Sequence, residues 1–272
     1  MGWPGVGFIR WTLDPDNQLL AAYDPLCRSV AVGQGAPRKD VVRAMDEEPA
    51  STTRARVIWP APVLLVVASV AFTLAARGNG PFPGERDLTL WMHRNSPTPV
   101  DMMGAALDPL VTDLTAPLVF AGIFLTTWWR WGRHSATVLG LAGAFTALTR
   151  IGDIVERPRP TATGSWTDHH FGNGGYPSGH VVFTVLVLGT VALLARRHSS
   201  PVVVRRLTVL AVALVAVTAW TRISDLEHWP LDVFGALTMS TAALYGVSYV
   251  ECRLDGLTTG RTRLRGLLGL PS

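Results

Sequence analysis

Six long apolar runs constrain this chain more than any other feature of its sequence. They cover residues 57–76, 110–129, 135–154, 179–195, 207–220 and 231–250. About 20 apolar residues cross the hydrocarbon core of a bilayer, and the shorter runs reach that length with flanking residues. The runs are apolar on every face, whereas helices of a soluble protein carry an apolar stripe. The predicted fold class is therefore all-α, a polytopic membrane helix bundle with six transmembrane helices.

Positive charge is distributed unevenly around these runs. With the N-terminus in the cytoplasm, 17 of the 24 Lys and Arg residues fall on the cytoplasmic side, as the positive-inside rule requires. We therefore expect a multi-pass plasma-membrane protein with both termini in the cytoplasm. The net charge of +4 then reflects topology, and no nucleic-acid partner is expected. Cys27 and Cys252 both fall on the cytoplasmic side, where no disulfide is expected.

Three segments follow from this layout. Residues 1–56 are polar, without periodicity, and are predicted to be a disordered cytoplasmic tail. Residues 57–250 form the predicted six-span domain, and 251–272 a C-terminal cytoplasmic tail. Met45, followed by acidic residues and two arginines, is a natural alternative start. The sequence indicates no oligomeric state.

Polar clusters stand at the ends of four of the runs. The third run ends near Arg150 and Arg157, the fourth begins at residues 178–180, the fifth ends at Arg222, and the sixth begins near His228. Counting the crossings puts all of them on one membrane face, the outer one. Ionisable groups at a membrane edge are costly and usually functional, so this face is the predicted site.

The residue types in these clusters suit an anion. Arg150 and Arg157 are seven residues apart, two turns of a helix, and so would share one face. Their forked donors fit phosphate oxygens, although Asp153 and Glu156 could instead be internal salt-bridge partners. His180 follows a glycine where a helix is expected to begin, and free backbone N–H groups at such a place bind anions.

The pair His228 and Asp232 is suited to nucleophilic chemistry. A spacing of four residues lets the carboxylate accept a hydrogen bond from one imidazole nitrogen. The other nitrogen is then aimed outward as a base or a nucleophile.

Taken in order, these clusters resemble the three-part signature of the type 2 phosphatidic acid phosphatase family, which shares its site with vanadium haloperoxidases. The matching motifs are Arg150-x6-Arg157-Pro158, Pro177-Ser178-Gly179-His180 and Thr221-Arg222-x5-His228-x3-Asp232. The resemblance implies that His228 is the nucleophile, that Asp232 orients it, and that His180 is the general acid. The implied phosphate-binding residues are Arg150, Arg157, Ser178, Gly179 and Arg222.

Two positions depart from the family pattern. Arg150 stands where lysine is typical, which keeps the charge but adds bulk. Thr221 stands where serine is typical and keeps a hydroxyl. These departures bear more on substrate preference than on activity.

The function expected from this resemblance is a membrane phosphatase that acts on a lipid phosphate or diphosphate through a phosphohistidine. Polyprenyl diphosphates such as undecaprenyl diphosphate, and phosphatidic acid, are the expected types of substrate. No metal or other cofactor is expected, because the adjacent His169 and His170 lack a third ligand at suitable spacing. The abundance of Arg over Lys, 23 to 1, is associated with GC-rich bacterial genomes.

Three alternatives remain open at this point. The chain could be a phosphatase for small soluble phosphates, or a transferase that passes the phosphoryl group to an acceptor other than water. It could also be a catalytically silent membrane transporter or scaffold with an anion pocket.

Overall fold

A computed structural model describes residues 60–77, 80–112, 114–155, 157–160, 166–167 and 175–267, with side chains for residues 61–254 of these ranges except 166–167. The predicted N-terminal tail, Met45 and the His169-His170 pair lie outside the described residues. A compact unit spans Trp59–Glu251.

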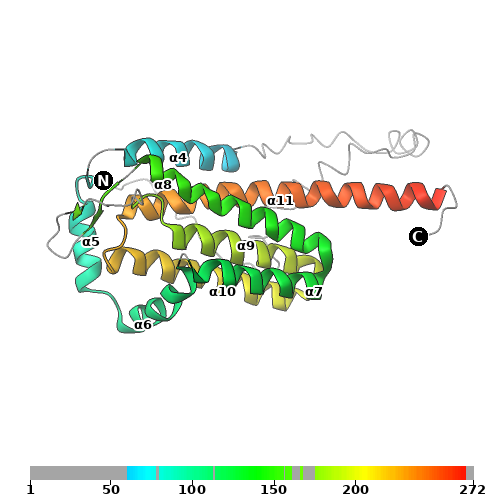
Figure 1. Ribbon diagram of the computed structural model, residues 1–272, viewed down its shortest axis with the longest axis horizontal. Helices are drawn as coiled ribbons and strands as arrows, with labels where there is room; N and C mark the ends of the chain where they lie inside the picture. Colours follow the sequence, from blue (N-terminus) through cyan, green and yellow to red (C-terminus); the bar gives the residue numbers. More distant parts are fainter. Residues whose placement is uncertain are drawn as a thin grey trace, which may run out of the picture. The chain divides into compact units, whose positions relative to one another are not determined.

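The described chain is almost entirely helical (Figure 1). In order, the elements are α4 (Pro60–Ala76), α5 (Glu85–Arg94), α6 (Thr98–Leu107), η1 (Asp108–Val111), α7 (Thr115–Phe145), η2 (Thr146–Ile151), α8 (Gly152–Val155), β1 (Arg159–Pro160), β2 (Trp166–Thr167), α9 (Gly179–His198), α10 (Pro201–Ser224) and α11 (Pro230–Leu267). The two short strands pair antiparallel, with Arg159 opposite Thr167.

Four helical segments in the described part of the chain are long and apolar enough to cross a membrane. They are Thr115–Val155, Gly179–His198, Pro201–Ser224 and Pro230–Leu254, and a shorter apolar helix covers Ala61–Ala76. The prediction of an all-α membrane bundle is confirmed. The count of six spans stays a prediction, because it requires α4 to cross and Thr115–Val155 to cross twice.

The helix α7 is a hairpin of two arms. Gly132 interrupts it with φ 83° and ψ 178°, a left-handed conformation that glycine adopts without strain. A Cβ on Gly143 would overlap the Phe120 ring, and one on Gly140 would lie 3.5 Å from Phe124. The residues of each pair lie at nearly equal distances in sequence from Gly132, which shows that the arms pack antiparallel, as Figure 1 also shows. Small residues in the second arm allow such close packing.

The helix α9 is the centre of the bundle and α10 lies at its edge. In the most apolar window of α9, 56% is buried, compared with 17% for α10. Val182 and Leu186 of α9 pack in one cluster with Ile223 of α10 and Val233 of α11. Since Gly179 begins α9 beside the end of α10 and the start of α11, this core fixes the polar clusters relative to one another.

The helix α4 is tied to the loop that precedes α9. The hydroxyl groups of Thr73 and Tyr176 lie 2.9 Å apart in a hydrogen bond. The ring of Tyr176 is fully buried and covers Gly235 of α11 so closely that a Cβ there would overlap it. The Tyr176 loop is thereby held between α4 and α11.

One expectation about the cysteines is wrong. Cys252 is disulfide-bonded, whereas the charge distribution placed both cysteines in the cytoplasm, where a disulfide is not expected. The bonding partner lies outside the described residues.

Candidate active site

His228 lies in the short connection between α10 and α11. Its backbone N–H donates to the Arg222 carbonyl at 2.9 Å, and Leu226 turns the chain with φ 63°. The ring Nδ1 lies 2.5 Å from the Gly175 carbonyl oxygen. A carbonyl only accepts hydrogen bonds, so Nδ1 carries the hydrogen and Nε2 of the neutral ring keeps its lone pair. This is the state that a nucleophilic imidazole requires.

The environment of His228 favours that neutral state. Burial lowers the pKa of His228 well below its usual 6.5, and the positive charges of Arg159, Arg222 and His180 lower it further, while the hydrogen bond to Gly175 opposes them. The structure therefore brings His180 and Arg222 close enough to His228 for their charges to act on it.

Asp232 does not hydrogen-bond to His228. Its Oδ2 lies 4.0 Å from Nδ1 of His228, within ion-pair reach but beyond hydrogen-bond distance. The same carboxylate accepts from the Trp229 backbone N–H at 2.8 Å and from Arg157 Nη1 at 2.7 Å. The hydrogen bond that His228 was expected to donate to Asp232 is thus replaced by one that it donates to the Gly175 carbonyl, and Asp232 is the charged neighbour of the imidazole.

Arg157 is the centre of a buried charge cluster. Its side chain is fully buried and contacts Asp232 on one side and Oε2 of Glu85 at 2.6 Å on the other. Glu85, the first residue of α5, also accepts from the Leu231 backbone N–H at 2.8 Å. Arg157 thereby joins α5 to the start of α11, and both of its terminal nitrogens are engaged by carboxylates.

Ser178 and Gly179 form the N-terminus of α9. The Ser178 side chain is fully buried, and its Oγ has no hydrogen-bond partner among the described residues. The first N–H groups of a helix have no acceptor within it, and a Cβ on Gly179 would meet only Thr149, at 3.8 Å. A buried hydroxyl without a partner beside free N–H groups is suited to an oxygen of a bound anion.

His180 and Arg222 meet at the carboxylate of Asp108. Oδ1 of Asp108 lies 3.1 Å from Nε2 of His180 and 2.6 Å from Nη1 of Arg222. Asp225 approaches the other terminal nitrogen of Arg222 at 3.4 Å. The predicted acid and one predicted phosphate ligand are therefore adjacent in the structure.

Arg150 does not join the other residues. Its side chain is 80% exposed and lies 3.6 Å from Asp153, one of the salt-bridge partners considered above. The shared helical face predicted for Arg150 and Arg157 is wrong, because residues 146–151 form a 3₁₀ helix and α8 ends at Val155, before Arg157.

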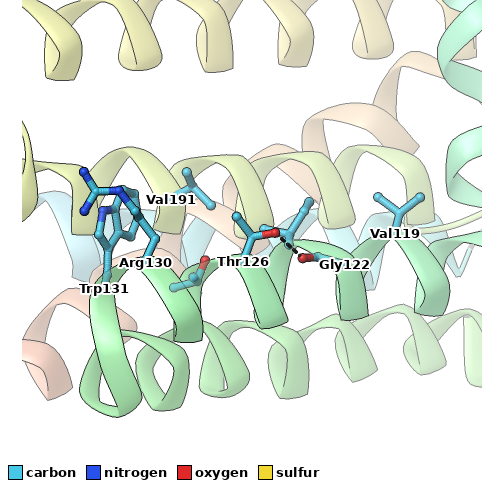
Figure 2. Close-up of a pocket in the computed structure, with 8 residues that line it drawn as sticks. Val119, Gly122, Thr126, Arg130, Trp131 and Val191 are labelled. Carbon is cyan, nitrogen blue, oxygen red and sulfur yellow. Dashed lines mark hydrogen bonds between the residues drawn. The ribbon is translucent and has the colours of Figure 1, made fainter.

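Two adjoining cavities extend from this cluster. One, of about 190 Å³, is lined by Asp108, His180 and Arg222 at one end and by apolar side chains beyond them. The other, of about 380 Å³, runs along the first arm of α7 to Arg130 and Trp131 (Figure 2). Val119 and Ile123 line both cavities, so the two cavities adjoin each other along the first arm of α7. We call this pair of adjoining cavities the apolar path.

Comparison with known proteins agrees with this geometry. Residues 131–253 match the family model of the PAP2 superfamily. The predicted resemblance to the PAP2 superfamily is confirmed. This PAP2 region contains all three motifs, from Arg150 to Asp232.

The fold supports the same conclusion. The structure is similar to the crystal structure of a transmembrane PAP2 type phosphatidylglycerolphosphate phosphatase from Bacillus subtilis, with a TM-score of 0.56 and 15% sequence identity. The match covers 69% of this chain and 94% of that chain. No curated protein matches the sequence. The chain thus has the fold of a membrane PAP2-type phosphatase.

Three residues of the site were not predicted from the sequence. Glu85 and Asp108 lie outside the PAP2 region, in the stretch between the first two apolar runs, where no site residue was predicted. Gly175 contributes only a backbone carbonyl, which no side-chain pattern reveals. A weak signal existed for Asp108, because an acidic residue directly before the second apolar run, at 110–129, lies on the predicted outer face.

Proposed function

We propose that the protein hydrolyses a lipid phosphate or diphosphate through a phosphohistidine on His228. The observation that carries this proposal is the apolar path that begins at His180 and Arg222, because it suits a substrate with a charged head and an apolar tail. The PAP2 fold and the orientation of His228 support the chemistry.

The reaction would take place in two steps. Nε2 of His228 attacks phosphorus, and the bond to the leaving oxygen breaks as that oxygen takes a proton from His180. Water then attacks the phosphorus of the phosphohistidine and gives a proton to His180, which releases inorganic phosphate and restores both histidines. Arg222, Ser178 and the Gly179 N–H would hold the phosphoryl oxygens, since phosphoryl transfer depends on positioning and charge stabilisation.

Arg150 and Arg157 need a conformational change to act as phosphate ligands. Arg150 is exposed, and Arg157 is held by two carboxylates. Asp232 would stabilise the imidazolium character of His228 through charge at 4.0 Å. No step of this mechanism uses a metal, and phosphate release that is unchanged by EDTA would support that feature.

The length of the apolar path suits one leaflet of a bilayer. Val191, which lines the deeper cavity in Figure 2, is eleven residues after His180, about 16 Å along α9. Half of a hydrocarbon core is about 15 Å thick. The hydroxyl of Thr126 is already hydrogen-bonded to the Gly122 carbonyl at 2.8 Å and so requires no polar partner from a ligand. An isoprenoid or acyl tail fits this lining.

A substitution inside the path tests the lipid substrate. Val191→Trp fills part of the 380 Å³ cavity, and displacing two methylenes of a tail costs roughly 1.6 kcal/mol. We expect kcat/KM for a long-chain substrate such as undecaprenyl diphosphate to fall by about tenfold. The value for a water-soluble phosphate ester should stay unchanged. Val212→Trp on α10, where Val212 is 64% exposed, is the control. An equal loss for both substrates would contradict the assignment of the path.

The pKa of His228 gives a second expectation. Because the nucleophile must be unprotonated, kcat/KM should fall on the acid side only where His228 becomes protonated, below its usual 6.5. Arg159→Gln removes a cation that lowers this pKa and should move the acid limb to higher pH. The measurement is the pH profile of kcat/KM for both proteins, with Arg133→Gln at the other end of the bundle as control. An acid limb unmoved by Arg159→Gln would show that another group determines it.

The outward orientation of the site is also part of the proposal. The arginine distribution supports cytoplasmic termini, whereas the disulfide at Cys252 is more typical of an oxidising compartment. Labelling of intact cells with a membrane-impermeant reagent, directed at a cysteine introduced at exposed Arg94 or at exposed Arg133, distinguishes the two orientations.

A further inference from the structure

The carboxylate of Asp108 lies where a phosphoryl oxygen of the substrate would be expected. Its Oδ1 contacts the imidazole of His180 at 3.1 Å and the guanidinium of Arg222 at 2.6 Å. These are the proton donor and the cation that the proposed mechanism assigns to the phosphoryl group. One oxygen cannot share that place with another, so Asp108 and a bound phosphate exclude each other there.

The other carboxylates of the site are less suited to move. Asp232 and Glu85 are 0% and 10% exposed, and they accept hydrogen bonds from the backbone N–H groups of Trp229 and Leu231 at the start of α11. Asp108 is the first residue of the four-residue 3₁₀ helix η1, and its side chain is 45% exposed. Because water can solvate the released carboxylate, separating this pair costs little compared with separating a buried one.

Movement of Asp108 would also act on the apolar path. Leu107, Leu110 and Val111, which flank Asp108 in the chain, line the same 190 Å³ cavity that His180 and Arg222 line. A displacement of η1 therefore changes the mouth of the cavity that would receive the substrate tail. Phosphate binding and tail entry are coupled through one short segment.

We propose that Asp108 is an internal competitor for the phosphoryl position, which it occupies until a phosphate monoester or diphosphate displaces it. This inference rests on the proposed phosphatase function. As a consequence, an anion binds only if it displaces the Asp108 carboxylate from the site. This matters in a membrane, where monoanionic phosphodiester headgroups surround the protein at high concentration. Competition weakens every anion by the same factor. Headgroups that bind weakly are thereby kept out, while a tightly bound dianionic substrate still enters.

Two small anions that cannot be hydrolysed through this mechanism test the proposal. Methylphosphonate is a dianion at mildly alkaline pH, and dimethyl phosphate is a monoanion of similar size. Their dissociation constants are measured by calorimetry on the detergent-solubilised full chain, for the wild type, Asp108→Asn and Asp108→Ala. Asp225→Asn is the matched control, because Asp225 contacts Arg222 at 3.4 Å through the other terminal nitrogen.

The expected result is that both anions bind Asp108→Asn more tightly by the same factor. That factor is about fivefold, as for loss of an ion pair of ordinary strength. Asp108→Ala should give the same gain, and Asp225→Asn a smaller one. A structure with methylphosphonate bound should have Asp108 out of contact with His180.

Three results would overturn the inference. A gain clearly larger for the dianion would mean that Asp108 stays in place and repels the ligand. Unchanged or weaker binding of both anions to the two Asp108 variants would mean that Asp108 positions His180 and Arg222. Absence of binding of either anion to any of the four proteins would overturn the phosphoryl site itself and the proposed function with it.

Discussion

Replacing His228 by alanine is expected to lower kcat/KM for phosphate release by at least about 10³-fold, because it removes the nucleophile and leaves only binding and charge stabilisation. This expectation depends on the tautomer of His228. Its Nδ1 donates a hydrogen bond to the Gly175 carbonyl at 2.5 Å, so Nε2 is the nitrogen that can attack phosphorus. Because the side chain of His228 is 5% exposed but makes no other side-chain hydrogen bond among the described residues, the variant should still fold.

The covalent intermediate gives a second measurement on the same variant. Rapid quenching of the wild type with a ³²P-labelled substrate should trap label on the protein that is stable in base and lost in acid, as a phosphohistidine is. The His228→Ala variant should trap none. His93→Ala is the control, since His93 on α5 hydrogen-bonds the Ser224 carbonyl at 2.7 Å outside the proposed mechanism. Label retained by His228→Ala would assign the nucleophile to another residue.

Much of the fold follows from the apolar runs alone. Runs of spanning length without a polar face require a membrane bundle, and the break between the runs at 110–129 and 135–154 corresponds to the turn at Gly132 in α7. The motif residues Ser178, His180, Arg222 and His228 also come together as the topology count predicted. Local signals suffice here, because each motif stands at a helix end and the helix ends are fixed by the runs.

Partners within the site could not be predicted in the same way. The hydrogen bond from His228 to Gly175 spans 53 residues and uses a backbone carbonyl, whereas the spacing of four residues pointed to Asp232. Glu85 and Asp108, which contact Arg157 and Arg222, come from α5 and η1. The positions of these two elements depend on packing against α10 and against α7 and α9, respectively. The predicted spacing also assumed a continuous α-helix through Arg157, whereas residues 146–151 form a 3₁₀ helix and α8 ends at Val155.

Because Arg157 is buried between two carboxylates, its replacement is expected to destabilise the protein strongly. Arg157→Gln leaves Asp232 and Glu85 without their cation at 0% and 10% exposure. Removing one partner of a buried ion pair typically destabilises by about 3–5 kcal/mol, because a charge stays buried without compensation. For a domain of this size, that corresponds to a fall in Tm of roughly 10 °C. The measurement is thermal unfolding of the purified protein in detergent.

Arg159→Gln is the matched control for this effect. Arg159 lies two residues further along the chain and pairs with Glu227, but the two side chains are 29% and 43% exposed. Loss of such a pair costs at most about 1 kcal/mol. The double variant Arg157→Gln with Glu85→Gln should regain part of the lost Tm, since one buried charge is then neutral. If Arg157→Gln instead kept the wild-type Tm and raised only KM, Arg157 would act mainly on the phosphate, as the family resemblance implies.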